Sequence, residues 1–65
     1  MNMNEPENAY YIEFVTIDNQ VKVTAIEPSS GIEASVICPV QSTRKQMADL
    51  AIRKLHYVLK KRNHE

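Results

Sequence analysis

The one cysteine of the chain, Cys38, and its two histidines, His56 and His64, could form a thiol nucleophile with a neighbouring base. A cysteine reacts as its thiolate, and a nearby histidine can take up the proton that it releases. However, Cys38 falls in phase with the apolar residues of a predicted strand, where a buried cysteine acts as a small hydrophobic side chain. We therefore predict that the chain is not an enzyme and has no catalytic residues.

The same three residues do not form a metal-binding pattern. Their spacing matches no ligand motif, and a structural zinc site needs four ligands. The chain holds a single glycine, Gly31, so it has no glycine-rich loop that could cradle a phosphate group. We expect neither a metal nor a cofactor.

Basic side chains are the most unevenly distributed feature of the sequence. Residues 42–65 hold seven Lys or Arg against Asp49 and Glu65, a net charge of +5, whereas residues 1–41 carry −5. A basic segment can attract an anionic partner, although a solvated helix face is the commoner explanation. Nucleic-acid (RNA) binding is therefore the alternative hypothesis for this chain. Its candidate residues are Arg44, Lys45, Arg53, Lys54, Lys60 and Lys61.

These cations belong to a predicted amphipathic helix over residues 43–62. Apolar residues recur at helical spacing from Met47 to Leu59, and no Gly or Pro interrupts the run. Thr43 and Gln46 fit a capping box at its start. Some exposed apolar residues are normal, but Leu50 and Tyr57 miss the core stripe. They lie two turns apart and close together on the helical wheel, with cations on either side, so they could contact a partner. The partner-binding candidates are Leu50, Tyr57, Arg53, Lys54 and Lys61.

Three strands are predicted before the helix, over residues 10–18, 21–27 and 32–38, because β-branched and aromatic residues alternate there with polar ones. A tight turn is expected at Asp18-Asn19 or Asn19-Gln20, and a second turn at residues 28–31. The fold class is therefore α+β: a three-stranded antiparallel β-meander with one C-terminal helix packed on one face (β-β-β-α). The predicted core contains Ile12, Phe14, Val23, Val36, Ala51, Leu55 and Val58.

The chain is expected to form one small domain over residues 9–62, with a disordered tail at 1–8 and a frayed end at 63–65. No run of residues approaches the ~18 apolar residues of a membrane span. Residues 1–8 lack the basic and apolar regions of a secretory signal, so we expect a cytoplasmic protein with no membrane partner. A core this small also favours self-association, with a homodimer as one expected form.

The segment EFVTIDNQVKVTAIEPSSGIEASV, then Pro39, then LAIRKLHYVLKKR, resembles a family of short, mainly alphaproteobacterial proteins classed as a domain of unknown function. This resemblance covers nearly everything after residue 9. It implies no activity.

A weaker resemblance is to the latter part of double-stranded-RNA-binding domains, in which three strands lead into a helix. That likeness implies phosphate contacts by a basic cluster at the helix start, where Ser42, Arg44 and Lys45 stand here. The first helix of that domain is missing, and a tight turn at Asp18-Asn19 replaces its long loop. Any binding to duplex RNA should therefore be weak.

The favoured hypothesis is a small non-catalytic interaction module. It would contact an unknown protein, or a second copy of itself, through the helix and the open face of the sheet. Zero net charge argues against strong affinity for phosphates, which places the nucleic-acid alternative second.

Overall fold

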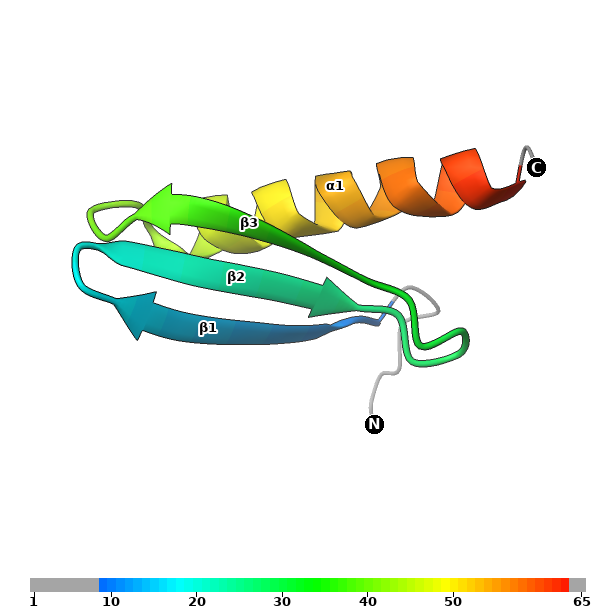
Figure 1. Ribbon diagram of the computed structural model, residues 1–65, viewed down its shortest axis with the longest axis horizontal. Helices are drawn as coiled ribbons and strands as arrows, with labels where there is room; N and C mark the ends of the chain where they lie inside the picture. Colours follow the sequence, from blue (N-terminus) through cyan, green and yellow to red (C-terminus); the bar gives the residue numbers. More distant parts are fainter. Residues whose placement is uncertain (1–8, 64–65) are drawn as a thin grey trace.

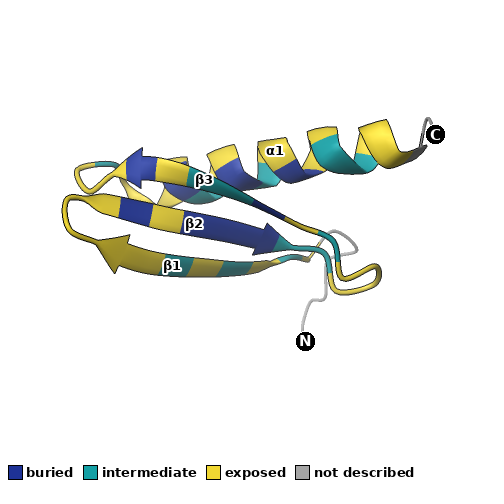
Figure 2. Cartoon of the chain, viewed as in Figure 1, coloured by how far each residue is buried: buried dark blue, intermediate teal, exposed yellow. Residues whose placement is uncertain are grey.

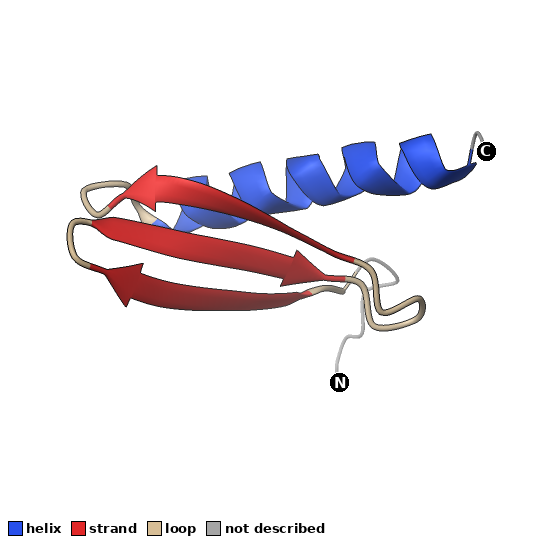
Figure 3. Cartoon of the chain, viewed as in Figure 1, coloured by secondary structure: helices blue, strands red, loops and turns tan. Residues whose placement is uncertain are grey.

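A computed structural model describes residues 9–63 of the chain, and residues 1–8 and 64–65 are not described. The chain forms three strands and then one helix, in the order predicted (Figures 1 and 3). The elements are β1 (Tyr11–Ile17), β2 (Gln20–Ile26), β3 (Glu33–Pro39) and α1 (Arg44–Asn63). The predicted α+β, β-β-β-α arrangement is confirmed. The predicted tail at 1–8 and the last two residues of the predicted frayed end lie outside the described residues.

The sheet is an antiparallel meander in the order β1-β2-β3. A two-residue turn joins β1 to β2, with Ile17 paired to Gln20 and Asp18 in the left-handed region at φ 57°. Aspartate tolerates this conformation better than most residues, which explains the position of the turn. The register then aligns the apolar sets of the three strands, as in the row Phe14, Val23 and Val36.

The β2–β3 connection is held by its own hydrogen bonds. The Gly31 amide donates to the Glu27 carbonyl at 2.8 Å, and the Glu27 amide donates to the Ile32 carbonyl at 2.9 Å. Gly31 has φ 76°, a conformation that a residue with a Cβ atom rarely adopts. The single glycine of the chain therefore stands where the backbone needs it.

The start of α1 carries the predicted capping box in both directions. The Gln46 amide donates to Thr43 Oγ1 at 3.1 Å, and the Thr43 amide donates to Gln46 Oε1 at 3.0 Å. Two amides that the first helical turn would otherwise leave unpaired are thus satisfied. No helix among residues 9–63 is long and apolar enough to cross a membrane.

The core lies between α1 and the helix-facing side of β2 and β3 (Figure 2). Its buried apolar residues are Val21, Val23, Ala25, Ala34, Cys38, Met47, Ala51 and Leu55. Of the predicted core, Val23, Ala51 and Leu55 are fully buried. The other four, Ile12, Phe14, Val36 and Val58, are only partly buried and pack against this cluster.

No residue of β1 is buried, which corrects the expectation that Ile12 and Phe14 are core residues (Figure 2). The reason is the position of the helix. α1 packs on β3 and β2 and scarcely touches β1, which lies at the opposite edge of the sheet (Figure 1). The helix-facing side chains of β1 are therefore covered on one flank only.

Replacing Leu55 with alanine should lower the free energy of unfolding by about 2–5 kcal/mol, because the side chain is fully buried between helix and sheet. A core of this size supplies only ~3–5 kcal/mol, so the variant should be largely unfolded by circular dichroism at room temperature. Leu50→Ala makes the same chemical change on the exposed side and should shift stability by less than about 0.5 kcal/mol. Identical urea melts for both variants would show that the buried stripe is wrongly assigned.

Candidate functional site

The outward side of α1 presents two large apolar side chains among cations. Tyr57 is 61% exposed and Leu50 is 45% exposed. Both miss the buried stripe of the helix, so they project away from the sheet. We define the helix patch as Leu50, Arg53, Lys54, Tyr57 and Lys61. The structure thus places the five predicted partner-binding residues on one continuous side of the helix.

Two members of the helix patch interact directly. Lys61 Nζ lies 5.9 Å from the centroid of the Tyr57 ring, at the i, i+4 spacing that places side chains next to each other on a helix. This distance suits a cation–π contact, worth about 0.5–1 kcal/mol at an exposed site. The contact orients the ring while leaving most of its surface exposed to a partner.

Lys54 fixes the patch to the sheet. Its Nζ donates to the Ser35 carbonyl of β3 at 2.8 Å, which connects the flank of the helix to the outer edge of β3. From the sequence, Lys54 is a candidate for partner binding and for nucleic-acid binding, and no contact with the sheet is predicted for it. A helical wheel places it at the border of the apolar stripe, which was the only signal for this contact.

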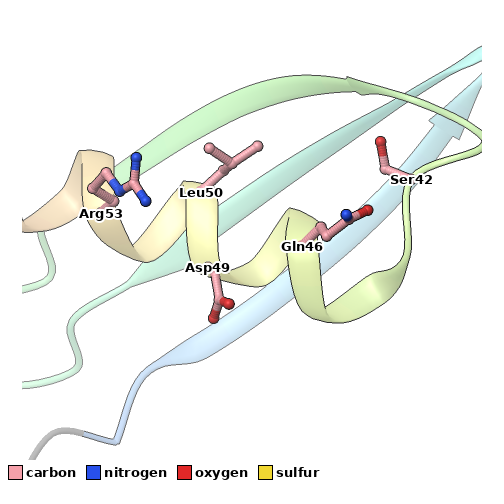
Figure 4. Close-up of a pocket in the computed structure, with 5 residues that line it drawn as sticks. All are labelled: Ser42, Gln46, Asp49, Leu50 and Arg53. Atoms are coloured by element: carbon pink, nitrogen blue, oxygen red, sulfur yellow. The ribbon is translucent and has the colours of Figure 1, made fainter.

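An open pocket adjoins the patch at the N-terminal half of the helix. It is lined by Ser42, Gln46, Asp49, Leu50 and Arg53 (Figure 4). The lining combines a leucine, a carboxylate and a guanidinium, which suit mixed apolar and polar contacts with another macromolecule. Leu50 and Arg53 belong to both features, so the pocket extends the helix patch toward the β3–α1 loop.

The cations at the start of the helix have partners within the chain. The Arg44 guanidinium carbon lies 4.6 Å from the centroid of the Phe14 ring, and Lys45 Nζ lies 3.2 Å from an Asp49 carboxylate oxygen. A cation at a helix N-terminus costs about 0.3–1 kcal/mol, and a cation–π contact at an exposed site is worth a similar amount. The contact with Phe14 therefore offsets the unfavourable position of Arg44.

The Lys45–Asp49 pair is mostly exposed, so it contributes little to stability. Among the remaining nucleic-acid candidates, Lys60 is exposed in the last turns of the helix. The six candidates consequently extend along the whole helix. They do not gather in one cluster.

Cys38 and His56 are not brought together. Cys38 is 2% exposed and pairs with Val21, whereas His56 Nε2 lies 2.8 Å from the Tyr10 hydroxyl. Tyr10 precedes the Tyr11–Ile26 row, about 17 Å along the sheet from the Val21–Cys38 row. His64 lies outside the described residues. Within residues 9–63, no group of three or more His, Cys, Asp or Glu side chains could hold a metal ion.

The buried thiol gives a direct test of accessibility. We expect Cys38 in the folded protein to react with a disulfide reagent at least about 100-fold more slowly than in urea, because the reagent reaches it only after the domain opens. Stopped-flow absorbance would measure both rates. A native rate close to the urea rate, without unfolding, would mean that Cys38 is an accessible and reactive thiol.

The face of the sheet opposite the helix is also partly apolar. Tyr11, Val15, Ile17 and Ile37 are about half exposed or more. Thr24, at the centre of this face, is buried and shares a 2.8 Å hydrogen bond with the Ser35 hydroxyl. The open face therefore has a polar centre with apolar side chains around it.

Comparison with known proteins identifies a family. The model described as "Domain of unknown function (DUF6898)" matches residues 7–62 of the chain. No curated protein matches, and no solved structure matches. The likeness to double-stranded-RNA-binding domains stays a prediction.

Proposed function

Because the chain belongs to the DUF6898 family, a domain of unknown function, we propose from its surface chemistry that it is a small, non-catalytic interaction module of the cytoplasm. Its helix patch would bind another protein. The open sheet face offers a further apolar surface for the same kind of contact.

One observation carries this proposal: Leu50 and Tyr57 are exposed two turns apart on the same side of the helix, with the three cations of the helix patch on that side as well. Exposed apolar groups with a polar rim are typical of protein contact sites. Tyr and Arg are also the residue types that most often dominate binding energy at such sites.

The surface chemistry of the patch defines the partner that would fit it. Leu50 and Tyr57 need an apolar surface, and Arg53, Lys54 and Lys61 need carboxylates around that surface. Lys54 and Lys61 already have contacts within the chain that hold them in place. Less side-chain entropy would therefore be lost on binding than with free lysines.

Tyr57→Glu should abolish capture of the partner from cells of the source organism. The substitution adds a negative charge where the partner is expected to carry carboxylates, and it removes an exposed ring without touching the core. With the purified partner, the affinity should fall about 30-fold or more, the effect of losing ~2 kcal/mol at an interface hot spot. Calorimetry or surface plasmon resonance would measure the affinity.

Ser29→Glu is the matched control, because it makes the same change in net charge at an exposed position in the turn between β2 and β3. If a protein is recovered equally with the parent, Ser29→Glu and Tyr57→Glu, the helix patch is not the contact surface. Circular dichroism should be unchanged for both variants.

Nucleic-acid binding is the competing outcome, and it has a distinct signature. Each phosphate contact releases condensed counterions, so affinity for RNA would fall steeply between ~50 and ~200 mM salt. Because the six candidate cations extend along the whole helix and do not gather in one cluster, we expect a flat titration with labelled duplex and single-stranded RNA at ~50 mM salt. The net charge of zero supports the same expectation.

Salt-dependent RNA binding would replace the interaction-module proposal if the slope also decreased by about two units when Arg44 and Lys45 are both changed to alanine. Capture of a protein partner that is lost after nuclease treatment would point the same way.

A further inference from the structure

The two edges of the sheet differ in how they are protected. An exposed edge strand presents unpaired amides and carbonyls that can pair with another strand, and natural proteins usually protect such edges with charges, prolines or covering elements. Here the order β1-β2-β3 makes β1 and β3 the two edges (Figure 1).

The hydrogen-bond pattern shows which backbone groups face outward. The Val40 amide donates to the Asn19 carbonyl, and the Glu27 amide donates to the Ile32 carbonyl. Backbone groups alternate in direction along an antiparallel strand, so the odd-numbered residues of β2 bond to β3 and the even-numbered ones bond to β1. Glu13 pairs with Thr24, which places the odd-numbered residues of β1 toward β2. The outward amides and carbonyls of β1 are therefore those of Ile12, Phe14 and Thr16.

The β3 edge is protected. By the same alternation, Glu33, Ser35, Ile37 and Pro39 direct their backbone groups outward. Lys54 occupies the Ser35 carbonyl at 2.8 Å, and Pro39 has no amide to donate. Both devices are known ways to prevent strand addition.

The β1 edge has neither device. Its sequence, YIEFVTI, is rich in β-formers and has no proline, no lysine and one charge. The helix does not cover this edge, because α1 packs on β3 and β2. Among residues 9–63, no other strand or side chain bonds to the outward groups of Ile12, Phe14 or Thr16.

We infer that β1 pairs with β1 of a second copy of this chain, antiparallel and about a two-fold axis at Phe14, to form a continuous six-stranded sheet. This contact is separate from the helix patch, so either can fail without the other. Full overlap of Tyr11–Ile17 with itself places Phe14 opposite the partner's Phe14 and Ile12 opposite the partner's Thr16. In this register the outward backbone groups of Ile12, Phe14 and Thr16 face those of the second copy. The three hydrogen-bonded residue pairs would give about six backbone hydrogen bonds.

Side chains on the open face support this register. It places the partner's Glu13 beside Val15, in the same row as Lys22, so a carboxylate and an ammonium approach each other across the seam. A shift of two residues would instead set Glu13 opposite the partner's Glu13, and like charges directly opposite are unfavourable. On the helix side, the half-buried Ile12 and Phe14 would gain cover. A second copy therefore fits the β1 edge, because its own β1 has the same sequence and its Glu13 would approach Lys22.

Sedimentation equilibrium of the full chain from ~10 µM to ~1 mM tests the inference. We expect the mean mass to rise toward twice the monomer mass as the concentration increases. One pair of seven-residue strands forms a small interface, and small interfaces support only weak association. Thr16→Pro removes an outward amide and should raise the dimer dissociation constant at least about 10-fold, because an edge strand tolerates proline at such a position. Thr16→Lys, which keeps the amide and adds a charge to the edge, should act in the same direction and serves if the proline variant unfolds.

Ile37→Pro is the matched control, because it removes an outward amide from the β3 edge. It should leave dimerisation unchanged within about 2-fold. Isotope-filtered NMR on mixed labelled and unlabelled protein should show contacts between the Tyr11 ring and Ile17 methyl groups, which lie about 20 Å apart within one chain. A monomer at ~1 mM, a dimer lost with Ile37→Pro but kept with both Thr16 variants, or the absence of these contacts in a dimer would each overturn the inference.

Discussion

The width of a single helix is the constraint on which the rest of this structure depends. An α-helix with its side chains is about 10 Å across, and neighbouring strands are about 4.8 Å apart, so one helix covers two strands well and a third poorly. α1 packs on β2 and β3, where Val23, Ala51 and Leu55 are completely enclosed. The third strand, β1, is left with no buried residue. Its partial exposure follows from the number of elements in the chain and needs no special sequence feature.

The same constraint explains how several helix cations are used. Arg44, the first residue of α1, lies over the ring of Phe14 on the poorly covered strand β1. On the other flank, Lys54 closes the backbone edge of β3. Two of the helix cations therefore serve contacts with the sheet, through an aromatic ring and a backbone carbonyl.

The arrangement of elements could be predicted from the sequence because each signal is local. The change from alternation to helical spacing, the Thr43–Gln46 capping box and the turns at Asp18 and Gly31 all depend on neighbours within a few residues. The position of the helix across the sheet is not local. A helical wheel places Lys54 on one border of the apolar stripe and His56 on the other, but it does not tell which border faces which strand.

That missing information explains why Ile12 and Phe14 were predicted to be core residues. Their burial would need a helix that covers β1 as well as β2 and β3. The Tyr10–His56 and Lys54–Ser35 contacts likewise depend on where the helix lies across the sheet. The helix patch could be predicted because it requires only that Leu50 and Tyr57 miss the stripe. Its internal contact between Lys61 and Tyr57 follows from the i, i+4 spacing alone. Contacts within one helix or strand could thus be predicted from the sequence, and contacts between the helix and the sheet could not.

The two proposed contact surfaces have a geometric relation that affects function. The helix patch lies on the flank of α1 that Lys54 joins to β3, and the proposed seam lies at β1, the opposite edge of the sheet. Pairing through β1 would therefore leave both helix patches free, one near each end of a six-stranded sheet. A dimer of this kind could hold two copies of a partner, or two sites on one partner. In the second case, the first contact raises the effective concentration for the second, and the overall affinity can exceed that of one patch by ~100-fold or more without any new contact. A small domain whose single patch binds weakly would gain most from such an arrangement, because its own surface is too limited to supply high affinity alone.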